Sequence, residues 1–436
     1  MNAMSSDKPP SVYASSLASI VEENAIYPWE NLELNQQKQI QQAIASAKPP
    51  NCIVYPRTQA QLAAVIAEAY RQNWRVLPCG KTSKINWGGL VQSADIVVST
   101  EHINQLIEHA VGDLTVTVEA GMQFSHLQGI LAKSRQFLAL DPSRPDSATI
   151  GGIVATSDTN SLRQRYGSVR DQLLGITFVR ADGQIAKAGG RVVKNVAGYD
   201  LMKLFTGSYS TLGVISQVTF RVYPLAETSG TVVLTGTAEA ISQAANTLRS
   251  SALTPTQADL LSTQLTSKLG LNQGLGLIAR FQSISESVKE QSNRLLAVGQ
   301  QLGLDGTIYV NEDEGSLWQR LRELMDDAVT ESAITCKIGV LPTAAVEVLT
   351  QAELGLIHLA SGLGWLQFED KNQVLKMRER CEVNRGFLSI LTAPNPVKEA
   401  MDVWGYSGNS LQVMRQIKAQ FDSNNILSPG RFVGGI

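Results

Sequence analysis

The sequence is poor in the residue types that most often bind metals. It has four cysteines and four histidines in 436 residues, and no two cysteines are spaced as CxxC or CxxxC. Iron–sulfur clusters and structural zinc sites usually need such closely spaced thiolate ligands. The histidines, too, stand apart: His102, His109, His126 and His358. The sequence therefore predicts no cluster and no metal site in this chain.

Basic clusters and long apolar runs are also missing. A net charge of −2 with no basic run gives no reason to expect nucleic acid or an anionic membrane as a partner. No stretch reaches the roughly 18 consecutive apolar residues of a membrane span, and the first 16 residues lack a signal-peptide core. We expect a soluble, cytoplasmic protein with reduced cysteines and no transmembrane segment.

Three loops rich in glycine and hydroxyl residues are the main positive feature. They are CGKTSK (79–84), SATIGGIVAT (147–156), and the long stretch GGRVVKNVAGYDL (189–201) followed by LFTGS (204–208) and TLGVI (211–215). Small residues let backbone N–H groups approach an extended anion such as a dinucleotide pyrophosphate. In the first loop, Lys81 or Lys84 could add positive charge. Taken alone, this first loop is equally typical of an ordinary strand-to-helix connection.

The length of the chain and its composition predict more than one domain. Residues 1–48 are polar and indicate an N-terminal arm. Alternating strands and helices follow up to residue 226, without the GxGxxG motif of a Rossmann fold. Longer amphipathic patterns in 227–410 predict a second, capping domain, and 411–436 form a C-terminal segment.

Hydrophobic periodicity predicts particular elements within these parts. Thr58 is the expected N-cap of a helix with Leu62, Val65 and Ile66 on its apolar face. The other expected elements are strands at 74–77, 96–98, 115–121, 214–222, 276–281 and 307–310, and helices at 287–302, 317–329 and 411–421.

The order and the amino-acid sequences of the three loops resemble those of the FAD-binding family of vanillyl-alcohol oxidase, p-cresol methylhydroxylase (PCMH) and the FAD-linked 2-hydroxyacid dehydrogenases. The resemblance implies an α+β protein. A two-subdomain PCMH-type FAD-binding domain (49–226) is followed by an α/β cap domain (227–410), and segment 411–436 returns to pack on the FAD domain. The residues that match the family's FAD-binding positions are Gly80, Lys81, Thr82, Ser83, Gly151, Gly152, Thr156, Gly167, Gly213, Val214 and Ile215.

The chain departs from the family at two places. Several members attach the flavin covalently through a histidine of the first loop, but residues 75–90 contain no histidine, so the resemblance implies non-covalent FAD. Catalytic 2-hydroxyacid dehydrogenases carry a metal-binding HxGDGNxH run and a later EHG. The counterpart here is HLASGLGW (358–365), and EHG does not occur. His358 and Lys194 remain as catalytic candidates, although a lone histidine on an apolar segment is more often structural.

Within the family, KNVAGYDLMKLFTGS (194–208) and FDSNNILSPGRFVGG (421–435) are similar to the two paralogous FAD-binding polypeptides of glycolate oxidase, the D-type and the E-type. The end of the cap fits the E-type better. Trp365 and Trp404 are expected in the core rather than stacked on flavin.

This likeness implies an oxidoreductase subunit for glycolate or a related 2-hydroxyacid, working with a paralogous flavoprotein and an iron–sulfur subunit. That complex could bring it to a membrane. Two alternatives stay open: a self-sufficient FAD-dependent D-2-hydroxyacid (D-lactate or glycolate) dehydrogenase, and a non-catalytic flavin-binding subunit.

Overall fold

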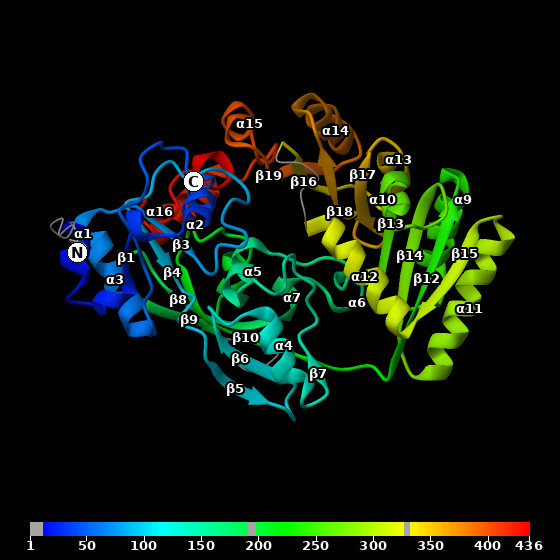
Figure 1. The fold of residues 1–436 in the computed structure, drawn as a ribbon, viewed down its shortest axis with the longest axis horizontal. Helices are drawn as coiled ribbons and strands as arrows, with labels where there is room; N and C mark the ends of the chain where they lie inside the picture. The colour runs from blue at the N-terminus through cyan, green and yellow to red at the C-terminus, as the bar shows by residue number, and fades with distance from the viewer. Residues whose placement is uncertain (1–11, 191–197, 327–331) are drawn as a thin grey trace, which may run out of the picture.

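The computed structural model describes residues 12–190, 198–326 and 332–436. Figure 1 shows two regions: strands and helices from the first half of the chain together with the C-terminal end, and a large sheet covered by helices from the second half. The first region contains separate sheets of four and five strands and a small two-stranded pair, and the second contains one sheet of eight strands.

The four-stranded sheet has the order β1 (Ile26–Pro28), β2 (Cys52–Val54), β4 (Ile96–Ser99) and β3 (Val76–Cys79). β2 and β3 run parallel to β4, whereas β1 is antiparallel to β2. Helix α3 (Gln59–Gln72) covers this sheet with its buried Leu62, Val65 and Ile66, and the predicted N-cap Thr58 is confirmed because it accepts a hydrogen bond from the Gln61 N–H. Helices α1 (Val12–Leu17) and α2 (Leu34–Gln41) precede the sheet's second strand.

The strand predicted at 74–77 begins later than expected. The Trp74 N–H donates to the Ala69 carbonyl, and Asn73 is left-handed, so these residues close α3. β3 begins at Val76 and continues to Cys79, at the start of the first glycine loop.

The five-stranded sheet is antiparallel, in the order β5-β6-β10-β8-β9. The strand predicted at 214–222 forms, ending at Arg221 as β10 (Val214–Arg221). Helices from the same half of the chain bury apolar side chains against this sheet. The other elements are β5 (Leu106–Ala110), β6 (Thr115–Glu119), α4 (Phe124–Ala132), α5 (Ile150–Thr156), α6 (Arg163–Tyr166), α7 (Val169–Gln172), β8 (Leu173–Val179), β9 (Ile185–Gly189) and α8 (Leu201–Phe205), with the small pair β7 (Gln136–Phe137) and β11 (Tyr223–Pro224).

The eight-stranded sheet is antiparallel throughout, in the order β15-β12-β14-β13-β17-β18-β16-β19. Four helices cover one face and two cover part of the other. The strands are β12 (Thr228–Gly236), β13 (Gln257–Leu261), β14 (Leu275–Ser283), β15 (Asp305–Val310), β16 (Ile334–Gly339), β17 (Leu354–His358), β18 (Leu363–Phe368) and β19 (Phe387–Thr392). The helices are α9 (Ala238–Ser250), α11 (Ser285–Gln301), α13 (Ala345–Leu349) and α14 (Lys371–Val383) on the first face, and α10 (Thr263–Lys268) and α12 (Asn311–Asp326) on the second.

Helix α12 begins six residues before the predicted start at residue 317. Its first turn carries Glu312, Asp313 and Glu314, which favour a helix N-terminus electrostatically but add nothing to an apolar periodicity. The pattern that predicted this helix therefore missed its first six residues, and the last predicted residues, 327–329, lie outside the described residues.

The C-terminal segment lies along the first region of the molecule. After α15 (Asn395–Ala400) and α16 (Leu411–Phe421), the Val76 N–H donates to the Ile426 carbonyl at 2.7 Å, and the Ser428 N–H donates to the Val76 carbonyl at 2.9 Å. These bonds join the end of the chain to the free edge of β3. Within the described parts of the chain, no helix is both long enough and apolar enough to cross a bilayer.

Candidate functional site

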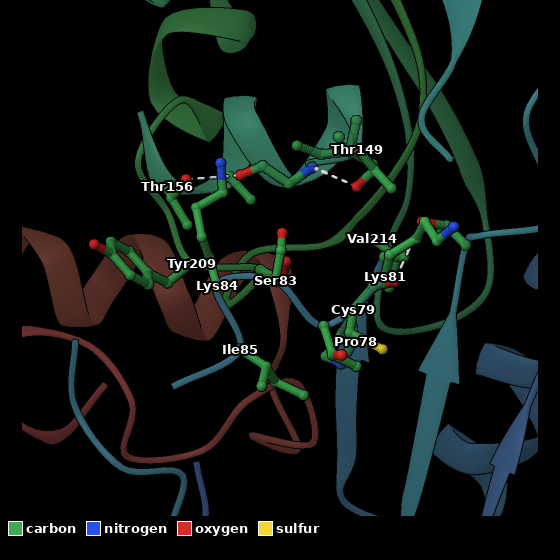
Figure 2. A pocket seen from close by; sticks show the side chains of 18 of the residues that line it. Pro78, Cys79, Lys81, Ser83, Lys84, Ile85, Thr149, Thr156, Tyr209 and Val214 are labelled. Atoms are coloured by element: carbon green, nitrogen blue, oxygen red, sulfur yellow. Dashed lines mark hydrogen bonds between the residues drawn. The ribbon is translucent and has the colours of Figure 1, made fainter. Parts of the chain in front are cut away.

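A cavity lies where the loop after β3, the helix α5 and the start of β10 meet. Figure 2 shows side chains of the β3 loop facing α5, which carries Thr156 and follows Thr149. Most of the residues predicted to bind FAD line this cavity: Gly80, Lys81, Thr82, Ser83, Gly151, Gly152, Thr156, Val214 and Ile215. Three loops that are far apart in the sequence therefore surround one space.

The first two loops touch each other directly. A Cβ on Gly80 would lie 2.2 Å from the hydroxyl oxygen of Thr149, so only glycine fits there. Thr149 caps α5 by accepting a hydrogen bond from the Gly152 N–H. The cap and the tight contact hold the β3 loop and the first turn of α5 against one another.

Gly151 and Gly152 differ in what surrounds them. The Gly151 N–H donates to the Ala120 carbonyl at 2.8 Å, and a Cβ on Gly151 would lie 2.7 Å from the Ala120 Cβ. On Gly152 the only close neighbour of a Cβ would be the Thr149 hydroxyl, at 3.1 Å. Gly151 thus lets α5 pack on the β6 end, whereas Gly152 leaves room in the cavity.

Lys84 does not offer free charge to a phosphate, which corrects one of the two expectations for the first loop. Its buried ammonium lies 2.6 Å from the Asp158 carboxylate, which also accepts the Ser143 N–H. Lys81 remains partly exposed, 3.5 Å from Glu101. Of the two lysines, Lys81 is the one whose charge can reach a ligand at the loop.

Arg431 lines the same cavity from the C-terminal segment, and the sequence analysis did not select it. Its guanidinium donates to the Ile85 carbonyl at 2.6 Å and lies over the Tyr209 ring, while burial lowers its pKa to about 10. Its Nε is buried with no hydrogen-bond partner among the described residues. A cationic donor without a partner fits an anionic or carbonyl-bearing ligand such as FAD. The only sequence signal was its place in the tail SPGRF.

Gly167 and Gly213 are not among the residues that line the cavity. Gly167 has φ +80° in the turn before the Ser168–Asp171 capping box. A Cβ on Gly213 would lie 2.9 Å from the Val179 carbonyl oxygen. The structure gives both glycines a local backbone reason, and their contact with FAD stays a prediction.

The two catalytic candidates have different outcomes. Lys194 lies outside the described residues. His358 ends β17 and is buried; its Nδ1 lies 2.6 Å from Asp259, which also accepts the Ser161 hydroxyl at 2.8 Å. His358 does not line the cavity described above. Ser161 belongs to the first region of the molecule, whereas Asp259 lies on β13 of the large sheet. The chain of three side chains thus crosses between the two regions.

The partner of His358 was not predicted. Asp259 is the one charged residue in the otherwise uncharged strand QADLL, which was the available signal. Nearby Asp141 is half-buried and accepts the N–H groups of Asn160 and Leu162. Burial raises the pKa of Asp141 to about 6, against the effect of those hydrogen bonds. The described residues contain no group of three or more His, Cys, Asp or Glu side chains placed to hold a metal ion.

Lys337 is a further residue that the sequence analysis missed. It lies on β16 opposite Trp365, and its neighbours Cys336 and Ile338 are buried in the core on the helix-covered face. Strand alternation therefore directs Lys337 to the other face, where it interacts electrostatically with Asp158 and Arg163 of the first region. Burial lowers its pKa, although the residue keeps part of its surface exposed, and the hydrogen bonds and salt bridges of the described residues do not include its ammonium.

Aromatic residues close the junction between the two regions. The rings of Trp87 and Trp365 are 5.4 Å apart, and those of Tyr209 and Trp404 are 5.0 Å apart. Trp365 is buried in this cluster, and Trp404 packs against it while its indole N–H donates to the Arg431 carbonyl. Both tryptophans thus pack at the junction, next to the cavity-lining Tyr209.

Comparison with known proteins assigns this architecture. Residues 50–189 match the family described as "FAD binding domain". The fold resembles p-cresol methylhydroxylase (TM-score 0.75, 15% identity, 96% of each chain) and alkyldihydroxyacetonephosphate synthase (TM-score 0.72, 14% identity, 98% of this chain and 86% of the other). The chain therefore contains an FAD-binding domain, and the resemblance and mixed α and β fold predicted from the sequence are confirmed.

Several sequence relatives have names that describe oxidation of hydroxyacids. Glycolate oxidase subunit GlcD of Bacillus subtilis (strain 168) is 29% identical over 184 residues, covering 42% of this chain and 39% of the relative. D-lactate dehydrogenase (cytochrome), mitochondrial, of Arabidopsis thaliana is 30% identical over 180 residues, covering 41% and 31%. D-2-hydroxyglutarate dehydrogenase of Stutzerimonas stutzeri (strain A1501) is 23% identical over 433 residues, covering 88% and 91%. The first two alignments thus span well under two thirds of those relatives' length.

Proposed function

We propose that this chain is an FAD-binding oxidoreductase subunit, resembling the E-type FAD-binding polypeptide of glycolate oxidase, that takes part in oxidising glycolate or a related small 2-hydroxyacid. The FAD cavity and the names of the sequence relatives support the general chemistry. The observation that carries the substrate class is Lys337, a cation with no direct ion-pair partner among the described residues, on the sheet face that is turned toward the FAD-binding region.

Lys337 fits the carboxylate that every 2-hydroxyacid carries. An ammonium that has lost part of its water and has no carboxylate in direct contact is unfavourable, so an anionic ligand beside it would be favoured. Bound FAD would supply the acceptor for the hydride, which carries both electrons of the oxidation. Lys337 would hold the substrate carboxylate, and the aromatic cluster around Trp87 and Trp365 would keep water from that side of the junction.

In this proposal, the chain passes the electrons on to partner proteins. The chain's scattered cysteines cannot supply an iron–sulfur cluster, so an iron–sulfur subunit would provide one, beside a paralogous flavoprotein with the full metal-binding motif. The relation to a glycolate oxidase subunit supports such a complex.

A second candidate function is a self-sufficient FAD-dependent D-2-hydroxyacid dehydrogenase. It is favoured by the hydrogen-bonded chain Ser161–Asp259–His358. A carboxylate at Nδ1 fixes the imidazole tautomer and strengthens Nε2 as a base, which could take the proton of the substrate hydroxyl.

Anaerobic stopped-flow mixing of the flavin-loaded chain with glycolate, D-lactate or D-2-hydroxyglutarate tests both functions by loss of the oxidised-flavin absorbance. We expect little bleaching by the chain alone and fast bleaching once the paralogous flavoprotein is added. Fast bleaching alone that is abolished in His358→Ala would favour the self-sufficient enzyme. A flavin that no 2-hydroxyacid reduces in either mixture would refute both and leave the non-catalytic subunit.

A further inference from the structure

We propose that Gln39, on helix α2, is a positioning residue for FAD: it braces the β3 loop in the conformation that receives the cofactor. Gln39 lies outside the cavity and outside every predicted FAD contact. The inference rests on FAD occupying this cavity, and it does not depend on the identity of the substrate.

The β3 loop contains an unfavourable backbone conformation. Thr82 has φ +58°, in the left-handed region. Side chains branched at Cβ adopt this region rarely because the branch crowds the backbone. Such a conformation persists only where surrounding contacts hold it. The loop that lines the FAD cavity therefore needs support from outside itself.

The contact that supplies this support points away from the cavity. The Thr82 hydroxyl donates to the side-chain oxygen of Gln39 at 3.0 Å. The hydroxyl is thus engaged with α2, although Thr82 matches one of the family's FAD-binding positions. The Thr82 carbonyl meanwhile accepts the Ile85 N–H at 3.0 Å, which closes the turn. Both groups of Thr82 are thus engaged within the protein.

Helix α2 is a firm base for such a brace. Ile40, next to Gln39, is fully buried and packs in one cluster with Leu77 of β3 and Val97 of β4. The Gln37 side chain donates to the Trp29 and Leu32 carbonyls, and the Gln41 side chain donates to the Ser46 carbonyl. The packing of Ile40 joins the helix to the strand from which the loop leaves, and the hydrogen bonds of Gln37 and Gln41 hold the helix to the segments on either side of it.

A groove on the α2 side of the loop supports the same interpretation. Residues 79–82 line both this groove and the FAD cavity, so the loop forms the wall between them. Across the groove, Gln36 donates to the Tyr55 hydroxyl at 2.9 Å, just as Gln39 accepts from Thr82. Hydrogen bonds thus join side chains on opposite sides of the groove, as expected for a structure that supports the β3 loop.

The test is a double-mutant cycle read out as FAD affinity. Apo protein would be titrated with FAD, following quenching of flavin fluorescence, for the wild type, Gln39→Ala, Thr82→Gly and the double variant. We expect Gln39→Ala to raise the Kd about fivefold, the usual effect of one hydrogen bond. Because glycine adopts positive φ without strain, Gln39→Ala should change the Kd less than about twofold when Thr82 is already glycine.

Matched variants separate the brace from a general loss of structure. Asn35→Ala, on the same helix and exposed, should leave the Kd unchanged. Gln39→Glu keeps an acceptor oxygen and should retain affinity, whereas Thr82→Val removes the hydroxyl and should reproduce the loss. Equal effects of Gln39→Ala in both Thr82 backgrounds, or no effect in either, would overturn the proposal. A wild type that binds no FAD would instead refute the cofactor assignment.

Discussion

Gly151 and Gly152 are adjacent in the chain, but adding a side chain at one would have different consequences from adding it at the other. A Cβ on Gly151 meets Ala120, which is buried in the core, whereas one on Gly152 meets only the Thr149 hydroxyl at the cavity. The same two-letter signal in the sequence therefore combines a glycine required by packing with a glycine that leaves space at the cavity. Only the three-dimensional surroundings distinguish the two.

Replacing Gly152 with Val should weaken FAD binding by about tenfold or more, since the branched side chain enters the space beside the loop. The thermal midpoint of the apo protein should change little. Gly151→Ala is the matched comparison: it should lower the midpoint because of the clash with Ala120. Fluorescence titration and thermal unfolding measure the two effects. Equal loss of affinity and stability in Gly152→Val would show a structural glycine.

Asp141 gives a prediction about pH. Its pKa is raised by burial to about 6, above the value of about 4 in an unfolded chain, so folding favours the protonated form. Its contribution to stability should be complete below about pH 4 and lost as pH rises through about 6. The difference in unfolding free energy between the wild type and Asp141→Asn, measured in urea from pH 4 to 8, should change across this window. A constant difference would contradict the shift.

At the scale of elements, helix α16 anchors the tail that carries Arg431. Its buried Lys418 donates to the Thr211 and Leu427 carbonyls and lies 2.6 Å from Asp422. Lys418→Met should destabilise the protein by about 3 kcal/mol, because Asp422 would keep a buried charge without its partner. Urea unfolding would measure this. Adding Asp422→Asn should recover part of the loss, and no recovery would mean that the ion pair is not the cause.

The β3 loop leads to a prediction about the cofactor's attachment. Residues 75–90 contain no histidine, and Cys79, the only thiol in the loop, has a pKa raised by burial to about 12, which leaves it a poor nucleophile. FAD should therefore be released into the supernatant when the loaded protein is precipitated with acid. Yellow colour that stays in the pellet would establish a covalent link.

Elements with strong local signals could be predicted from the sequence, and contacts made by topology could not. The Thr58 cap and its helix follow from local spacing, and the glycine loops follow from the needs of a phosphate-binding backbone. Asp259 and His358 are 99 residues apart, and antiparallel pairing of β13 with β17 brings them together. Arg431 reaches the cavity only because the tail lies along β3.

At the scale of the whole molecule, the proposed substrate position depends on both regions being joined. Lys398 of α15 donates to the Asn86 and Gly88 carbonyls, and the Arg144 N–H donates to Asp326 of α12 at 2.8 Å. These contacts join the large sheet to the FAD-binding region on either side of the aromatic cluster. Lys337 is thereby held at the junction and not at an open surface.

This placement predicts that a small dicarboxylate such as oxalate, an unreactive analogue of a 2-hydroxyacid, binds at the junction and perturbs the flavin spectrum. Lys337→Gln should weaken oxalate binding by about 10- to 100-fold, the range expected when a buried charge loses its partner. FAD affinity should stay the same, since Lys337 does not line the FAD cavity. Lys289→Gln, at an exposed position of α11, is the control and should bind oxalate like the wild type. If Lys337→Gln binds oxalate as tightly as the control, the substrate carboxylate is held elsewhere. Because binding is read from the flavin without turnover, the result does not depend on whether the chain needs a partner to react.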